Sequence, residues 1–188
     1  VVPTTPELLS LSAGEVFDQI LMREIQFCGI VEGTNFCFGK GRQGTVATLR
    51  EMCSRQGLEC RIVEPLFVNG ETVSSSVVRR LLQEGNVDKA NEMLGRPHRT
   101  SGIVVSGAQR GRTIGFPTAN VEQVETLLPA HGVYAARCHM AGSTYVAAVN
   151  LGPNPTFGVQ ISKLVAHLLD LTCDLYGRRI EVVFIKPA

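Results

Sequence analysis

The segment Ser101–Val121 has the residue types and spacing that best suit phosphate chemistry in this sequence of 188 residues. It reads SGIVVSGAQRGRTIGFPTANV, so glycines and arginines are interspersed before a Pro-Thr-Ala-Asn sequence. Glycine lets the backbone turn with positive φ and expose its amides to phosphate oxygens, and arginine adds charge-assisted hydrogen bonds. We predict a phosphate-binding loop here, formed by Gly107, Arg110, Gly111, Arg112 and Gly115.

Thr118 and Asn120 follow this loop, two residues apart on a segment predicted to be extended, so their side chains should point to the same side. A hydroxyl and an amide oxygen in that arrangement can both face a hard cation such as Mg²⁺ that bridges nucleotide phosphates. Hairpin glycines and ordinary strand-end turn residues give the same pattern without a ligand. The residues alone leave both interpretations open.

A second candidate site lies in the first half of the chain, where Ile30–Gly44 reads IVEGTNFCFGKGRQG. Phe36 and Phe38 can offer apolar faces to a flat ring. Lys40 and Arg42 can contact phosphates. A surface loop with two aromatic anchors is the alternative interpretation.

Three consecutive serines, Ser74, Ser75 and Ser76, precede a predicted helix that carries Arg79 one turn in. Hydroxyls and free amides at a helix N-terminus attract an anion, and the arginine adds a cation. Serine is also a preferred N-cap in any helix, so capping alone explains the same residues.

The composition limits the kinds of partner that we expect. The net charge is +1 and 19% of the residues are charged, so we expect no broad nucleic-acid surface. No apolar run in the sequence reaches the length of a membrane span, so we expect no membrane partner. The six cysteines show no CxxC pair and no zinc spacing, which is typical of reduced thiols in a cytoplasmic protein. The predicted partners are therefore small molecules.

The elements that position these residues differ between the two halves. In the first half, predicted helices and strands alternate, which favours an open α/β sheet. Ser12 and Glu15 have capping-box spacing at the start of a helix that runs to about Glu24. Asn69-Gly70 between short apolar runs predicts a two-residue hairpin. The other predicted elements are a buried strand over 26–31, a strand over 58–64, and helices over 45–56, 77–85 and 86–94.

The second half has a different pattern. Strand-length runs such as GVYAARCHM and TYVAAVNLG are separated by Gly, Pro, Asn and Asp turns, which predicts an all-β fold, a small antiparallel barrel. A helix stop and a proline coincide at Gly95–His98. We therefore predict two domains, residues 1–95 and residues 96–188.

Five segments of the second half resemble riboflavin kinases in the same order. GRTIGFPTANV resembles the family's nucleotide-binding signature, and LGRPHRTSGIVVSG, LPAHGVYAARC, NLGPNPTFG and HLLDLTCDLYGRRIEVVF resemble the segments around it. The resemblance implies a six-stranded antiparallel Greek-key barrel, in which Thr118 and Asn120 bind Mg²⁺–ATP and the loop 107–115 is a flap over the phosphates. The implied ATP-binding residues are Gly107, Arg110, Gly111, Arg112, Gly115, Pro117, Thr118 and Asn120.

The first half resembles the FMN adenylyltransferase (FAD synthetase) domain that precedes the kinase in bacterial bifunctional enzymes, a Rossmann-like nucleotidyltransferase domain. Ile30–Gly44 resembles its Val-Gly-x-Asp/Asn-Phe-x-Phe-Gly segment, and Val73–Arg79 resembles its Ile-Ser-Ser-Thr-x-Ile-Arg element. The implied site residues of this half are Gly33, Asn35, Phe36, Phe38, Gly39, Ser74, Ser75, Ser76 and Arg79.

Two departures from the family pattern bear on activity. None of His98, His131, His139 and His167 lies in the His-x-Gly-His type of loop on which adenylyl transfer rests, so we expect no nucleotidyl transfer by this chain. The resemblance places Val165 where riboflavin kinases have the glutamate that takes the proton of the ribityl hydroxyl, and valine cannot accept a proton. His167 should share the face of Val165 and is a candidate substitute base, with a half-buried strand histidine as the alternative.

Together these features predict an internal piece of a flavin-cofactor enzyme, without the front of the adenylyltransferase domain and without the helical segment that follows the barrel in the family. The predicted reaction is ATP-dependent phosphorylation of riboflavin to FMN and, in the intact protein, adenylylation of FMN to FAD. A catalytically degenerate nucleotide- or flavin-binding module is the rival hypothesis, and Val165 is the residue that separates the two. A split-barrel flavoprotein of another family is a third hypothesis, which the Pro-Thr-Ala-Asn sequence disfavours.

Overall fold

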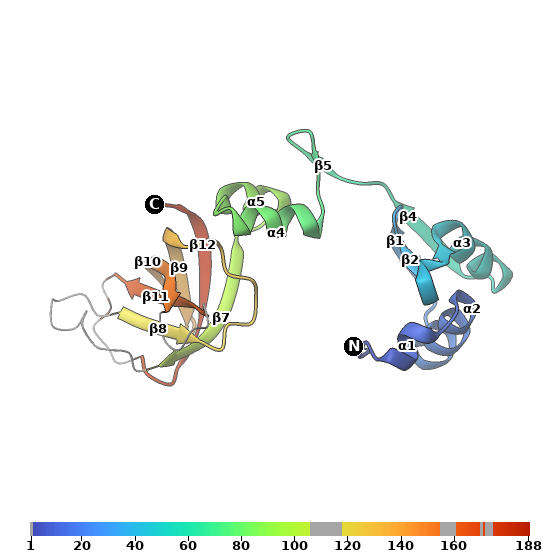
Figure 1. The fold of residues 1–188 in the computed structure, drawn as a ribbon, viewed down its shortest axis with the longest axis horizontal. Coiled ribbons are helices and arrows are strands. Elements are labelled where there is room, and N and C mark those ends of the chain that lie inside the picture. Colours follow the sequence, from blue (N-terminus) through green and yellow to red (C-terminus); the bar gives the residue numbers. More distant parts are fainter. Residues whose placement is uncertain (1, 106–117, 155–160, 170, 172–174) are drawn as a thin grey trace. The chain divides into compact units, whose positions relative to one another are not determined.

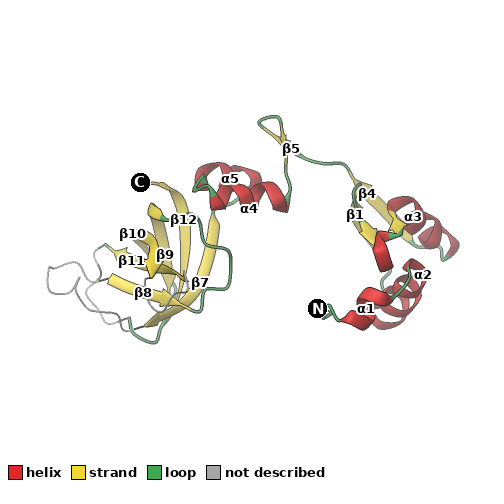
Figure 2. Ribbon diagram, viewed as in Figure 1, coloured by secondary structure: helices red, strands yellow, loops and turns green. Residues whose placement is uncertain are grey.

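The computed structural model describes residues 2–105, 118–154, 161–169, 171 and 175–188, in two compact units, Val1–Leu66 and Phe67–Ala188. Figures 1 and 2 show the elements of each unit. The helices are α1 (Pro6–Ser10), α2 (Ala13–Glu15), η1 (Val16–Ile25), η2 (Lys40–Arg42), α3 (Val46–Arg55), α4 (Ser75–Gln83) and α5 (Val87–Leu94). The strands are β1 (Gly29–Gly33), β2 (Cys37–Phe38), β3 (Gly44–Thr45), β4 (Glu59–Val63), β5 (Phe67–Val68), β6 (Glu71–Thr72), β7 (His98–Val105), β8 (Thr118–Glu122), β9 (Gly132–Met140), β10 (Ser143–Asn154), β11 (Ile161–Leu168) and β12 (Arg179–Pro187). No helix in these described ranges is long and apolar enough to cross a membrane.

The first unit is a small α/β unit. Strands β1 and β4 pair in parallel, as the predicted α/β alternation requires. The buried Leu49 and Cys53 of α3 form a core with Phe17 of η1, and Ile30 of β1 packs against this core. The prediction of a buried strand over 26–31 is wrong on burial, because Val31 is 64% exposed on the face of the sheet that turns away from this core.

Local signals in the sequence account for the ends of the helices. Ser12 and Glu15 form the predicted capping box, in which the Glu15 N–H donates to Ser12 Oγ at 3.3 Å and the Ser12 N–H donates to the Glu15 carboxylate at 2.8 Å. The helix then continues through η1 with π-helical hydrogen bonds and ends at Gln26, which has a left-handed φ of 54°. Strand β1 begins after this turn, at Gly29 rather than at the predicted residue 26. Thr45 caps α3 through its side-chain oxygen. Gly95 ends α5 with a left-handed φ of 65°.

Six strands of the second unit form a closed antiparallel barrel in the order β10-β11-β8-β7-β12-β9 (Figure 1). Along β9, every second residue is buried, including Tyr134, Ala136 and Cys138. This alternation fills the barrel with side chains and turns the remaining residues outward. The predicted six-stranded antiparallel barrel is confirmed.

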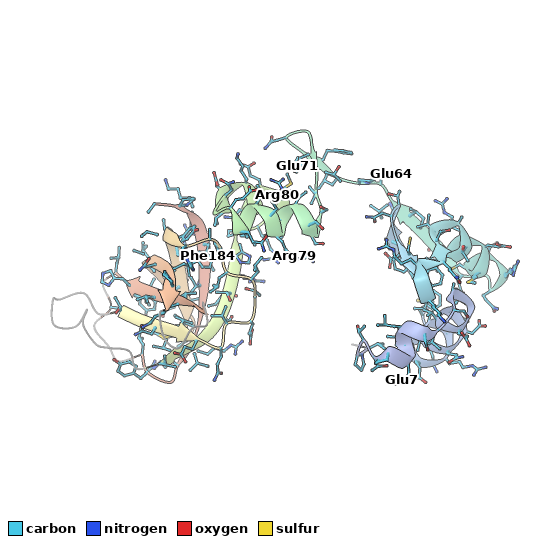
Figure 3. All side chains as sticks on the ribbon, in the orientation of Figure 1. Glu7, Glu64, Glu71, Arg79, Arg80 and Phe184 are labelled. Atoms are coloured by element: carbon cyan, nitrogen blue, oxygen red, sulfur yellow. The ribbon has the colours of Figure 1, made fainter. Side chains whose placement is uncertain are left out.

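The hairpin at Asn69-Gly70 and the helices α4 and α5 belong to this second unit. Asn69 and Gly70 both have positive φ, 52° and 80°, as a two-residue type I′ turn requires, and they join β5 to β6. Leu82 of α4 and Met93 of α5 share one hydrophobic core with Phe184 of β12, and Figure 3 labels Phe184 on the barrel. Residues 67–95 therefore belong to the same compact unit as the barrel, and the domain boundary predicted after residue 95 from the helix stop and proline stays a prediction.

Asn91 of α5 forms hydrogen bonds with two barrel strands, β7 and β12. Its amide nitrogen donates to the carbonyl oxygens of Phe184 and Ile185 at 3.0 and 3.1 Å, and its amide oxygen accepts the His98 N–H at 2.6 Å. The imidazole of His98 is 7% exposed, stacks on Phe184, and places Nε2 2.8 Å from the carbonyl oxygen of Leu127. A carbonyl oxygen only accepts hydrogen bonds, so Nε2–H is the donor, and burial lowers the pKa of His98.

Candidate active site on the outer wall of the barrel

Strand β8 presents Thr118 and Asn120 on the outer wall of the barrel. The residues that alternate with them, Ala119 and Val121, are 2% and 3% exposed and belong to the core. Because successive side chains of a strand point to opposite faces, Thr118 and Asn120 point away from the core together. Their predicted common side is confirmed. Thr118 is exposed to solvent, whereas Asn120 is only 8% exposed.

Asn120 begins a row of three residues that crosses β8, β11 and β10. Val165 is directly opposite Asn120, and Asn150 is directly opposite Val165. Opposed residues on antiparallel strands lie on the same face, with Cβ atoms about 4.5–5.5 Å apart. Position 165 is therefore flanked on the outer wall by two amide side chains, and we refer to these three residues as the Asn120 row.

A second row lies one step further along the same strands. His167 of β11 is directly opposite Thr118 on one side and Ala148 of β10 on the other. His167 is half-buried and already has an interaction partner in the structure. These rows place Val165, at the position of the family's glutamate, and His167, the candidate substitute base, beside the predicted nucleotide-binding pair.

Two charged residues on this wall were missed by the sequence analysis. Glu122 follows Asn120 by two positions on β8, and Lys163 precedes Val165 by two positions on β11. Glu122 is exposed and Lys163 is half-buried. The signal that could have found Glu122 is the alternation along β8, because Thr118, Asn120 and Glu122 occupy every second position.

The rest of the predicted nucleotide site lies outside the described residues. This applies to six of the eight predicted ATP-binding residues, which are Gly107, Arg110, Gly111, Arg112, Gly115 and Pro117. Among the residues that the structure describes, no group of three or more His, Cys, Asp or Glu side chains could hold a metal ion. Thr118 and Asn120 offer neutral oxygen atoms, a donor set that fits Mg²⁺ when phosphate oxygens and water complete its shell.

In the first unit, the predicted ligand residues are largely used for packing. Gly33 ends β1 and Asn35 follows it in a turn. The rings of Phe36 and Phe38 stack on each other, with centroids 5.5 Å apart, and Phe38 is 9% exposed within the core. Gly39 has a φ of 73°. A Cβ atom at this position would lie only 2.5 Å from the backbone nitrogen of Ala13 in α2. Gly39 and Phe38 therefore serve the fold of this loop directly.

The predicted serine site lies in the other compact unit. Ser74 is the N-cap of α4, and its Oγ accepts a backbone N–H three residues along at 3.3 Å. Ser75, Ser76 and Arg79 are exposed, and Figure 3 labels Arg79 on this helix. No described acidic residue forms an ion pair with Arg79. The residues predicted for adenylyl transfer are thus divided between the two units, with 33–39 in the first and 74–79 in the second.

Comparison with known proteins identifies the family. The riboflavin kinase family model matches residues 94–187, and the FAD synthetase family model matches residues 1–77. The chain belongs to the riboflavin kinase family. The resemblance found in five segments of the second half is confirmed, and so is the resemblance of the first half to FAD synthetase.

Relatives from several bacteria match along almost the whole chain. The bifunctional riboflavin kinase/FMN adenylyltransferase of Escherichia coli K12 is 36% identical over 178 residues, and that of Bacillus subtilis is 37% identical over 183 residues, each covering 94% of this chain. The Listeria monocytogenes protein of the same name is 33% identical over 192 residues. The chain spans 57% of the length of the first two relatives and 60% of the third.

A solved structure shares the fold. The crystal structure of a protein named macrolide-efflux protein from Streptococcus pneumoniae matches with a TM-score of 0.86 and 30% sequence identity. The match covers 98% of this chain and 59% of the other. The architecture described above is therefore also found in a crystal structure.

Proposed function

We propose that this chain carries the riboflavin kinase site of a bifunctional flavin-cofactor enzyme and transfers the γ-phosphoryl group of ATP to the 5′-hydroxyl of riboflavin, giving FMN and ADP. The family match over residues 94–187 and the names of the relatives support this function. The observation that carries the proposal is the outer wall of β8, where Thr118 and Asn120 face outward together beside position 165.

In this proposal, Thr118 and Asn120 hold the Mg²⁺–ATP complex through a hydroxyl and an amide oxygen. Bound Mg²⁺ neutralises charge on the phosphates during phosphoryl transfer. The pairing of β8 with both β7 and β11 fixes the backbone of this pair before the nucleotide arrives. Gly107, Arg110, Gly111, Arg112, Gly115 and Pro117 complete the proposed nucleotide site.

We also propose that residues 1–95 are the rear part of an FMN adenylyltransferase domain and that residues 96–188 are the riboflavin kinase domain. In the intact protein, the residues between Gly33 and Gly39 and those between Ser74 and Arg79 would contribute to making FAD from FMN. The FAD synthetase match over residues 1–77 supports this assignment. The substrates are small molecules, namely riboflavin, FMN and ATP, and the proposed location is the cytoplasm.

Calorimetric titration of ATP, with and without Mg²⁺, tests the nucleotide site. We expect binding that depends on Mg²⁺, and about tenfold weaker binding of Mg²⁺–ATP by Thr118→Ala, because one oxygen ligand is lost. Thr144→Ala, at an exposed outward position on β10, is the matched control and should bind as the parent does. Equal affinity in all these titrations would contradict the proposed metal role. Nucleotide binding without formation of FMN would instead favour the degenerate binding module.

A further inference from the structure

Phosphoryl transfer to an alcohol is assisted by a group that binds the hydroxyl and takes its proton as the new bond to phosphorus forms. In the Asn120 row, position 165 is a valine and cannot do this. A side chain that accepts the proton would have to be another residue that faces the space above this row. Four described residues lie on the same face two positions before or after Asn120 or Val165. They are Thr118 and Glu122 on β8 and Lys163 and His167 on β11.

Glu122 has the position that this role requires. It follows Asn120 on the same face of β8, and outward residues two apart on a strand are about 7 Å apart. The pairing of Val121 with Leu164 makes Glu122 a diagonal neighbour of Val165. Diagonal neighbours are about 7–8 Å apart, within reach of long side chains. The glutamate carboxylate and the Asn120 amide can therefore contact one ligand above position 165.

The other candidates are less suited to take the proton. His167 already has an interaction partner, and the ammonium group of Lys163 is a hydrogen-bond donor with no acceptor, which suits a phosphate oxygen. Within the described part of the chain, no lysine or arginine forms an ion pair with Glu122. The nearby Glu125, in contrast, pairs with Arg179. Glu122 is therefore the exposed carboxylate on this wall that is available for a substrate.

We propose that Glu122 is the catalytic base of the kinase reaction, an inference that rests on the proposed function. Its carboxylate accepts the hydrogen bond of the substrate hydroxyl and takes the proton while the hydroxyl oxygen bonds to the γ-phosphorus. The bond from the γ-phosphorus to the β,γ-bridging oxygen breaks, and its electron pair leaves with ADP. Glu122 then releases the proton to water. A carboxylate on β8 thus takes the role of the family's glutamate, which is absent from position 165 of β11.

Four forms of the chain test this assignment: the parent, Glu122→Gln, the control Glu125→Gln, and Glu122→Gln combined with Val165→Glu. FMN formation from riboflavin and ATP gives kcat and KM, and calorimetry gives the affinities for Mg²⁺–ATP and riboflavin. We expect Glu122→Gln to lower kcat by about 10²–10⁴-fold, the usual loss for a general base. Both affinities should stay within about twofold of the parent, because the interaction is made in the transition state. Glu125→Gln should have the same kcat as the parent. The double variant should have a kcat at least about tenfold above that of Glu122→Gln, because Val165→Glu restores a carboxylate.

The outcomes separate this inference from the proposed function. If the parent makes FMN and Glu122→Gln makes it equally fast, Glu122 is not the base and the kinase function stands. If the parent binds both substrates but only the form with Val165→Glu turns over, the carboxylate is required on β11, and the assignment to β8 is wrong. If no form binds Mg²⁺–ATP or riboflavin, the proposed function fails and the assignment fails with it.

Discussion

The motif loop of the first unit and strand β8 of the barrel both carry predicted ligand residues, but the fold uses them differently. In the loop, Phe38 lies in the core, and Gly39 approaches a neighbouring backbone so closely that a Cβ atom does not fit. On β8, the core takes the alternate residues and leaves Thr118, Asn120 and Glu122 facing outward. Core packing therefore uses the motif residues themselves in the loop, whereas on β8 it uses the residues that alternate with them.

The largest expected effect breaks the loop at Gly39. Gly39→Ala should destabilise the first unit by about 3 kcal/mol, because a strained φ is combined with a backbone clash. Gly41→Ala is the matched control, since Gly41 also has positive φ, 63°, but has open space around it. It should cost about 1 kcal/mol. Hydrogen exchange measured by mass spectrometry on residues 29–63 gives the local stability, and equal effects of the two changes would show that the loop is not packed as described.

A second comparison, within the barrel unit, is between a polar side chain used for packing and one exposed on the outer wall. Asn91→Ala should lower the unfolding free energy by about 2 kcal/mol, because it leaves the backbone groups of His98, Phe184 and Ile185 without their partner. Asn150→Ala, on the exposed outer wall, should change it by less than about 0.5 kcal/mol. Denaturant unfolding followed by circular dichroism measures both. If Asn150→Ala lowered the unfolding free energy as much as Asn91→Ala, the contrast between a polar side chain that joins elements and one exposed on the outer wall would be wrong.

The buried His98 predicts a pH dependence of the barrel unit. Burial lowers its pKa below the ordinary value of 6.5, so between the two pKa values the unfolded chain binds a proton that the folded unit excludes. The unfolding free energy should therefore fall as the pH is lowered below about 6.5, with a contribution of at most about 1.4 kcal/mol per pH unit. His98→Gln keeps an N–H donor toward Leu127 but does not titrate. Unfolding curves between about pH 5 and pH 7 should show a smaller slope for this variant, and an unchanged slope would assign the dependence to other groups.

The smallest expected effect compares two threonines of the barrel. The Thr100 side chain is 2% exposed, and its hydroxyl has no hydrogen-bond partner among the described residues. Thr100→Val keeps the shape and should stabilise the unit by about 1 kcal/mol, since an unsatisfied buried hydroxyl is removed. Thr118→Val on the outer wall should leave stability within about 0.5 kcal/mol while weakening nucleotide binding. Thermal unfolding measures both changes, and destabilisation by Thr100→Val would indicate that its hydroxyl has a partner.

The sequence by itself determined the features that depend on neighbours along the chain. The capping box at Ser12 and Glu15, the hairpin at Asn69-Gly70 and the helix end at Gly95 each form through contacts within a few residues. The common side of Thr118 and Asn120 also followed from the two-residue period of a strand. Five segments in order were specific enough to indicate the riboflavin kinase family and its barrel.

Only the tertiary structure decided which distant residues meet. Asn150 reaches the same row as Asn120 through the pairing of β10, β11 and β8, and strand register cannot be read from one strand alone. The contact of Asn91 with Phe184 joins residues 93 positions apart. The packing that buries Phe38 likewise depends on η1 and α3, which no local pattern around the phenylalanine specifies. Local hydrogen bonds and strand periodicity are encoded by near neighbours, whereas the choice between packing and binding is made where separate elements come together.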